Sequence, residues 1–179
     1  MTAVGNVYGE ALYDLAKEES LSEQILQELA VLQKSFSEEP AFLKLLSASN
    51  ISKQERCALL DETLGEKVHP YVLNFLKILT EKGYSRHFSS CCEAYREKYN
   101  TDNGIVPVTA VSAVALTDAQ KEKLTEKLAK ITGNTIDLTN RVDPEVLGGI
   151  RLDYSGKRLD DTVQHRLASI RELLKNTVL

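Results

Sequence analysis

The stretch from Val146 to Leu167, VLGGIRLDYSGKRLDDTVQHRL, decides the fold class of this chain. Within it the apolar residues Ile150 and Leu152 alternate with charged ones, which is the two-residue period of a half-buried strand. Ser155-Gly156 then favours a tight turn, because glycine tolerates the positive φ that a two-residue hairpin demands. The residues that follow, Lys157-Arg158-Leu159, are therefore expected to return as a second strand.

A helix is expected after this hairpin, with Asp160 or Asp161 accepting the free backbone N–H groups of its first turn. Its apolar residues recur at spacings of four, three and four and so share one face: Val163, Leu167, Ile170 and Leu174. This face contacts either the sheet of its own domain, which we favour, or another protein.

The residues before this stretch, from about 4 to 100, show helical periods only. Ser20-x-x-Glu23 and Ser52-x-x-Glu55 are capping boxes that predict the starts of two helices. Pro40 suits the first turn of a short helix, and Gly83 is expected to end the fifth. The predicted helices begin near residues 4, 20, 40, 52, 68 and 85, and six helices without strands predict a helical bundle.

From Asn103-Gly104 onward the period changes. Residues 105–111 are β-rich, although Pro107 favours an edge position or a bulge because it lacks an N–H group. Thr117-x-x-Gln120 is a third capping box, and residues 135–142 form a second predicted strand. Gly133-Asn134 is expected to end the helix between them, which places three apolar residues on one side: Leu124, Leu128 and Ile131.

The predicted fold class is therefore α+β. A six-helix bundle, residues 1–103, is followed by a small α/β domain, residues 104–179, with a mixed sheet and a C-terminal helix.

Composition excludes several classes of function. The net charge of −4 and pI near 5.5 argue against a nucleic-acid-binding protein, which usually has a basic face. The three cysteines match neither a disulfide framework nor a zinc site, so we expect free thiols. The N-terminus is acidic and amphipathic, unlike a signal or transit peptide, and the small apolar run of residues 113–116 is too short to span a bilayer. We expect membrane association only through another protein.

The sequence shows no pattern typical of an enzyme. Gly156-Lys157 lacks the second glycine and the hydroxyl residue of a phosphate-binding loop, so these glycines predict a turn. The three histidines lie far apart, and no nucleophile or metal motif is present. We predict no catalytic residues, cofactor or metal. The alternative is a small enzyme whose Arg151, Lys157 and Arg158 grip an anionic substrate, although side chains of a hairpin should alternate between its faces.

Two predicted helices carry more apolar surface than one-sided packing needs. The apolar residues of the first helix cover an arc of about 180°, and those of the fifth roughly 220°, at 3.6 residues per turn. A stripe a little over ~100° wide suffices for one-sided packing. Either these helices are enclosed by their neighbours in the bundle, or part of the surface accepts the amphipathic helix of another protein.

Three blocks in order along the chain resemble the delta subunit of F-type ATP synthases, called the oligomycin-sensitivity-conferring protein in mitochondria. They are Tyr8-x-x-Ala11-Leu12-x-x-x-Ala16, Asn74-Phe75-Leu76-x-x-Leu79-x-Glu81-Lys82-Gly83, and Leu147 to Leu167 with Gly148-Gly149, Asp160, Thr162 and Arg166. The chain departs from the family pattern at a few positions: Gly9 stands where alanine is usual, Tyr84 where arginine commonly follows the glycine, Asp161 where a small residue is usual, and Thr162 where serine is usual.

This resemblance implies a non-catalytic stator subunit that links the catalytic alpha/beta head to the peripheral stalk, so that rotor torque drives ATP synthesis. It implies that the N-terminal domain binds the amphipathic N-terminal helices of alpha subunits, and the C-terminal domain the C-terminal region of the b subunit. It places the chain on the cytoplasmic side of the plasma membrane. Carried over to this sequence, the partner-binding residues are Tyr8, Ala11, Leu12, Leu15, Phe75, Ile78 and Leu79. A helical adaptor of another complex is the remaining alternative.

Overall fold

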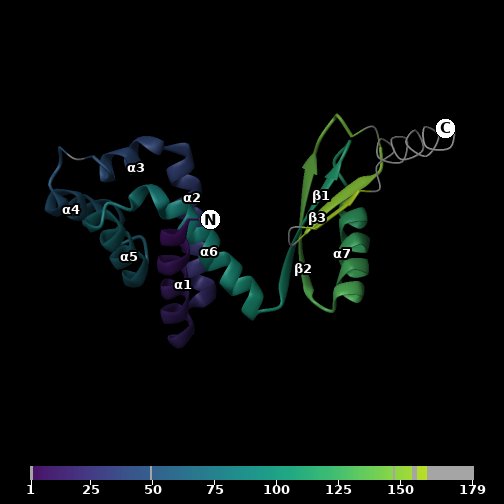
Figure 1. Ribbon diagram of the computed structural model, residues 1–179, viewed down its shortest axis with the longest axis horizontal. Coiled ribbons are helices and arrows are strands. Elements are labelled where there is room, and N and C mark those ends of the chain that lie inside the picture. Colours follow the sequence, from purple (N-terminus) through teal and green to yellow (C-terminus); the bar gives the residue numbers. More distant parts are fainter. Residues whose placement is uncertain (1, 49, 147, 155–156, 161–179) are drawn as a thin grey trace, which may run out of the picture. The chain divides into compact units, whose positions relative to one another are not determined.

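The structure is a computed structural model, and it describes residues 2–48, 50–146, 148–154 and 157–160. Its contacts divide the chain into two units, Met1–Tyr99 (unit 1) and Asn100–Leu179 (unit 2). The described chain is α+β, with helices in unit 1 and a mixed sheet in unit 2, as the sequence predicts (Figure 1).

The regular elements in the described part of unit 1 are all helices. Its elements are α1 (Ala3–Glu18), α2 (Ser22–Glu38), α3 (Pro40–Leu46), α4 (Lys53–Leu64), α5 (Pro70–Glu81), the 3-10 helix η1 (Ser85–His87) and α6 (Phe88–Asp102), which runs on into unit 2.

The predicted helix starts were right at α4 and wrong at α2. Ser52 caps α4, because its hydroxyl accepts the Glu55 N–H at 3.2 Å while the Glu55 carboxylate accepts the Ser52 N–H at 3.0 Å. Ser20 caps nothing, because it ends α1 instead: its φ is 58°, and the next residue donates its N–H back to the Ala16 carbonyl at 2.8 Å. α2 therefore begins only at Ser22, and its N-cap residue, Leu21, makes no side-chain hydrogen bond to the helix.

The core of unit 1 is built from aromatic and aliphatic side chains of most of its helices. Tyr13 of α1 meets Tyr95 of α6 edge-on at 5.4 Å between ring centroids, and Phe36 of α2 meets Phe88 of α6 at 5.1 Å. The Tyr95 hydroxyl is satisfied by donating to the Ser22 carbonyl at 2.9 Å, which ties α6 to the start of α2. The predicted inner face of α2 is buried as expected: Ile25, Leu29, Leu32 and Phe36.

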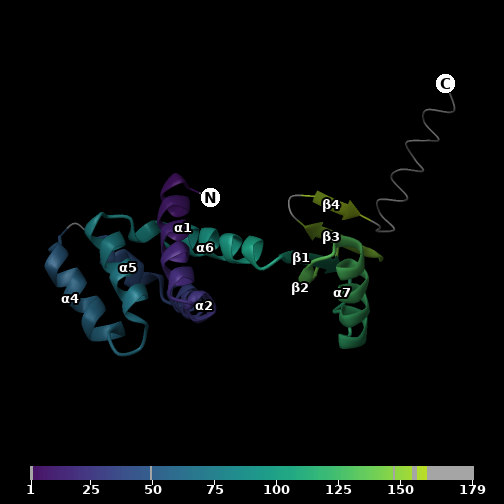
Figure 2. The same ribbon diagram turned by 90° about the horizontal axis from the view of Figure 1, so that it is seen from below.

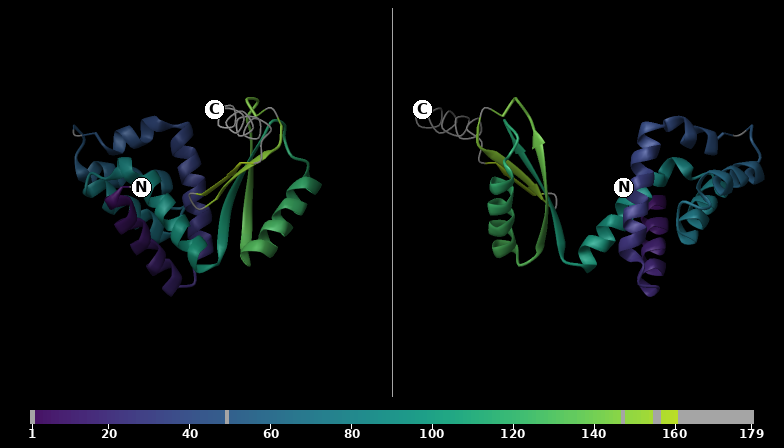
Figure 3. Two further views of the ribbon diagram at one scale, coloured as in Figure 1. Left: turned by 45° about the vertical axis from the view of Figure 1, so that its right-hand side comes forward. Right: turned by 180° about the vertical axis from the view of Figure 1, so that it is seen from behind.

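Unit 2 contains a four-stranded sheet in its described part. The strands are β1 (Ile105–Ser112), β2 (Thr135–Val142), β3 (Ile150–Tyr154) and β4 (Lys157–Asp160), in the order β2-β1-β3-β4. β1 and β2 are parallel, whereas β3 is antiparallel to both β1 and β4, so the sheet is mixed. The parallel pair is joined by α7 (Asp118–Thr132), which lies along one face of the sheet (Figure 3).

Two details of unit 2 differ from the sequence prediction. β1 has a neighbouring strand on each side, so the edge position predicted for it from Pro107 is wrong. The described pairing with β3 begins only at Val108, so Pro107 lies just outside it. Ile131 of α7 is 80% exposed and does not share the half-buried surroundings of Leu124 and Leu128. The Thr117 capping box and the left-handed Gly133 at the end of α7 are both confirmed. The predicted hairpin turn and C-terminal helix lie outside the described residues.

Candidate functional site

α1 is apolar on two sides, and only one of them is used by the core. The inner side packs so closely on α6 that Gly5 lies against Ser90 and Gly9 against the Cys91 carbonyl. The outer side carries Val7, which is 66% exposed, together with exposed Ala11 and Leu15. These outer residues sit four positions apart, so they form one continuous stripe along α1.

α5 shows the same division. Its inner side is buried in the core and includes Val72, Phe75, Leu76 and Leu79. Its outer side carries Ile78, which is 45% exposed, beside half-buried Tyr71. Both views in Figures 1 and 2 place α5 next to α1, and the ring of Tyr8 on α1 lies 5.9 Å from that of Tyr84, just after α5.

The seven residues carried over from the family therefore separate into two groups. Leu12, Phe75 and Leu79 are buried among the side chains of unit 1 itself. Tyr8 is half-buried, and three others are exposed: Ala11, Leu15 and Ile78. We name the outer set, with Val7 added, the α1–α5 face: Val7, Tyr8, Ala11, Leu15 and Ile78. Val7 is the most exposed member of this face. It could have been predicted from the sequence, because it lies on the same apolar arc of the first helix as Ala11 and Leu15.

Tyr84 is the residue at which the family pattern has arginine. Its ring packs against Tyr8 at 5.9 Å and His87 at 6.1 Å. The rings of Tyr8, Tyr84 and His87 thus form an aromatic cluster at this edge of the α1–α5 face.

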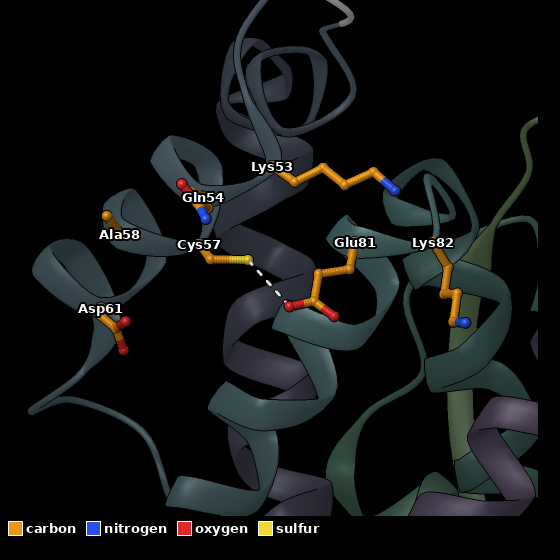
Figure 4. A pocket seen from close by; sticks show the side chains of 7 residues that line it. All are labelled: Lys53, Gln54, Cys57, Ala58, Asp61, Glu81 and Lys82. Carbon is orange, nitrogen blue, oxygen red and sulfur yellow. Dashed lines mark hydrogen bonds between the residues drawn. The ribbon is translucent and has the colours of Figure 1, made fainter.

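A pocket of about 480 Å³ lies between α4 and α5, and charged side chains and the Cys57 thiol line it (Figure 4). Asp61 in its lining pairs with Lys77 at 2.6 Å, and the Cys57 thiol lies 4.0 Å from the Glu81 carboxylate. Burial, with the charge of Glu81 adding to it, raises the pKa of the Cys57 thiol, so the thiol stays protonated at neutral pH. The pocket therefore offers no activated nucleophile.

The positively charged residues of the hairpin are also engaged. Arg158 donates to the Asp153 carboxylate at 2.8 Å, and Arg151 Nε lies 3.6 Å from the same carboxylate. The hydrogen bond from Arg158 holds the pKa of Asp153 below its usual range. Arg151 and Arg158 share one face of the hairpin, so the expected alternation was wrong for these two residues, and the side chain of Lys157 lies outside the described part of the chain. With Asp153 between them, the arginines do not form an open anion site. No cluster of three or more metal-ligating side chains occurs among the described residues.

Comparison with known proteins decides the family. The family model for the ATP synthase delta (OSCP) subunit matches residues 4–174. The chain belongs to this family. The delta subunit of Alkaliphilus oremlandii is 30% identical over 176 residues, covering 98% of both chains, and that of Latilactobacillus sakei is 32% identical over 173 residues, covering 96% of both.

The fold agrees with this assignment. A chain in the cryo-EM structure of the Toxoplasma gondii mitochondrial ATP synthase hexamer superimposes with a TM-score of 0.75 at 18% identity, covering 97% of this chain and 98% of that chain. As a delta (OSCP) subunit, the chain is a non-catalytic stator subunit of the peripheral stalk and works with other subunits of F-type ATP synthase in ATP synthesis and ion transport. The complex is membrane-associated, and no helix among the residues that the structure describes could cross a bilayer.

Proposed function

We propose that the α1–α5 face binds the amphipathic N-terminal helix of an alpha subunit in the catalytic head. Residues 1–103, packed as a six-helix bundle, form this joint, and residues 104–179 hold the C-terminal region of the peripheral-stalk b subunit. The chain acts on the cytoplasmic side of the plasma membrane and makes or breaks no covalent bond itself. The observation that carries the proposal is that two neighbouring helices both expose apolar side chains, Val7 and Leu15 on α1 and Ile78 on α5 (Figures 1 and 2).

The function of such a joint is mechanical. The rotor would turn the head along with it unless the head were tethered. Each charge that crosses the membrane releases about 2.3 kcal/mol per 100 mV, so the tether works under a substantial load. We predict a nanomolar joint, on the order of −12 kcal/mol.

The exposed side chains account for part of that energy. Fully burying a side chain such as Val, Leu or Ile contributes about 1.5–3 kcal/mol, so finishing the burial of Val7, Leu15 and Ile78 contributes roughly 2–4 kcal/mol. The apolar side of the partner helix loses its own contact with water at the same time and supplies the larger share. The buried residues Leu12, Phe75 and Leu79 form a rigid base under the face, which limits the entropy lost on binding.

Isothermal titration of the full chain with a synthetic alpha-subunit N-terminal peptide tests this proposal. Ile78→Asp places a charge on the α5 side of the face and should weaken binding by at least tenfold, which is about 1.4 kcal/mol. Val31→Asp is the matched control, because Val31 on α2 is also exposed, at 65%, and lies outside the face. Equal binding by the two variants would remove the assignment of the face, and no binding by the wild-type chain at micromolar concentrations would remove the proposed partner.

A further inference from the structure

β2 forms a free edge of the sheet in unit 2. The strand order β2-β1-β3-β4 leaves its outer side without a neighbouring strand in the described structure (Figure 2). β2 extends over eight residues and contains neither proline nor glycine. α7 lies on a face of the sheet, so it does not cover the backbone groups that point outward in the plane of the sheet (Figure 3). A free edge of this length is a template for pairing with another strand.

Two hydrogen bonds at the ends of β2 show which of its backbone groups point outward. The Thr135 N–H donates to the Gly104 carbonyl, and the Asp143 N–H, just after the strand, donates to the Ser112 carbonyl. The odd-numbered residues of β2 therefore turn their backbone groups toward β1. Because this direction alternates along a strand, the even-numbered residues turn theirs to the free edge: Ile136, Leu138, Asn140 and Val142.

The odd-numbered residues of β2 carry a symmetric pair of charges. Asp137 and Arg141 lie two positions before and two positions after Thr139, and all three residues are exposed on one face of the strand. No ion pair of Asp137 or Arg141 with another of the described residues is found. Both charges are thus available to a strand that pairs with the edge.

Two copies of β2 can pair antiparallel about a two-fold axis, which is the commonest symmetry of homodimers. Residues directly opposite each other in an antiparallel pair turn their backbone groups both toward the partner strand or both away from it. The axis must therefore pass through a residue of β2. An axis through Thr139 sets Asp137 opposite Arg141 of the second copy, and the symmetry forms this pair twice.

Other registers lose this match of charges. An axis through Leu138 sets Asp137 opposite Thr139 and leaves both charges of β2 without an opposite charge. An axis through Asp137, or one through Arg141, brings two identical charges together, which is destabilising. Charge complementarity therefore selects the register centred on Thr139.

We propose that β2 pairs with β2 of a second copy of this chain, antiparallel and with Thr139 on the two-fold axis. In this register Leu138 faces Asn140 of the second copy and Ile136 faces Val142 of the second copy. These facing pairs exchange about eight backbone hydrogen bonds, two for each pair. Val142, which is 47% exposed in the single chain, gains an apolar neighbour.

The size of the contact sets its strength. A single strand pair buries less surface than the roughly 1,200 Å² of a stable complex, so we expect a dissociation constant in the micromolar range. Such a dimer covers the free edge of chains that are not part of an ATP synthase and keeps that edge from pairing with unrelated chains. The proposal does not depend on how the chain binds the head.

Opposite charge reversals in the full chain test the register. Asp137→Arg and Arg141→Asp each set like charges opposite each other in a pair of identical copies, so each variant should be monomeric. An equimolar mixture of the two variants sets opposite charges against each other at both places and should form a heterodimer. Lys127→Asp is the matched control, because Lys127 is exposed on α7 and its reversal changes the net charge as Arg141→Asp does.

Sedimentation velocity from low micromolar to several hundred micromolar concentration measures the association, and circular dichroism confirms that each variant is folded. We expect dimers of the wild type and of Lys127→Asp, monomers of each edge variant alone, and dimers in their mixture. A wild type that stays monomeric, edge variants that dimerise as the wild type does, or a mixture that stays monomeric would each overturn the proposal.

Disulfide formation supplies a second readout. In a Cys57→Ser background, Thr139→Cys places a thiol on the axis, where the two Cα atoms of a non-hydrogen-bonded pair lie about 4.5 Å apart, within the range of a disulfide. Thr135→Cys is the control, because Thr135 is exposed on the same face of β2 but lies outside the paired residues. We expect intermolecular disulfides to form severalfold faster with Thr139→Cys. Equal rates for the two variants would contradict the register.

Discussion

Replacing Gly9 with alanine is expected to destabilise unit 1, although alanine is the better helix former and is the residue usual in the family at this position. Gly9 lies where α1 packs most closely on α6. A Cβ atom there would lie directly against the Cys91 carbonyl oxygen and 2.9 Å from the Cβ of Ala94. A backbone carbonyl within a helix cannot move aside alone, so the two helices must separate.

The size of the effect follows from two opposing terms. Overpacking a close contact costs about 1–3 kcal/mol. Alanine in place of glycine within a helix gains about 0.5–1 kcal/mol. The two terms leave a net loss of about 0–2.5 kcal/mol in the free energy of unfolding, centred near ~1 kcal/mol. Each kcal/mol lowers the Tm of a domain of this size by about 4–8 °C.

Urea and thermal unfolding followed by far-UV circular dichroism measure this loss. Glu10→Ala is the matched control, because Glu10 is exposed on the same helix and its replacement changes helix propensity without a new contact. A Gly9→Ala variant as stable as the wild type, or more stable, would refute the argument that the two glycines of α1 set its distance from α6.

Three further predictions concern single groups. Thr117→Ala removes the side-chain cap of α7 and should cost about 1 kcal/mol in thermal unfolding, with no change in the stability of unit 1. The hydrogen bond from the Ser52 N–H holds the pKa of the Glu55 carboxyl below its usual range, so the stabilisation by this bond is present above the ordinary carboxyl pKa and is lost as the pH falls through the lowered pKa. The urea midpoint of the wild type should exceed that of Glu55→Gln by an amount that shrinks over this pH interval. A difference in midpoint that does not depend on pH would contradict the assignment. Burial raises the pKa of Cys91 to about 11, and Cys57 is less buried, so alkylation of the native protein at neutral pH should be slow and should reach Cys57 first, as peptide mass spectrometry can show.

The features that sequence alone predicted well are local ones. The capping boxes at Ser52 and Thr117 were confirmed because each depends on two residues three positions apart, whose geometry the helix itself imposes. Ser20 has the same spacing but does not cap α2, because Ser20 is itself the left-handed residue that follows the end of α1. A local pattern therefore predicts a cap reliably only where no neighbouring helix end competes for it.

The division of the α1–α5 face could not be predicted, because it depends on contacts between distant segments. Helical periodicity placed Ala11 and Leu12 on one wide apolar arc, yet the structure exposes the first and buries the second. The close approach of Gly9 to α6 decides which of the two residues is buried, because it turns one side of α1 toward the core. In the same way, the central place of β1 follows from pairing with β3, which the lone signal of Pro107 could not reveal.

The most direct test of the stator joint is the affinity of the purified chain for the catalytic head that lacks it, measured by cosedimentation or titration. The account predicts nanomolar binding by the wild type and weaker binding by Tyr8→Asp, with circular dichroism confirming that the variant keeps its helices. Binding that is unaffected by Tyr8→Asp in a folded variant, or no binding of the wild type at micromolar concentrations, would contradict it.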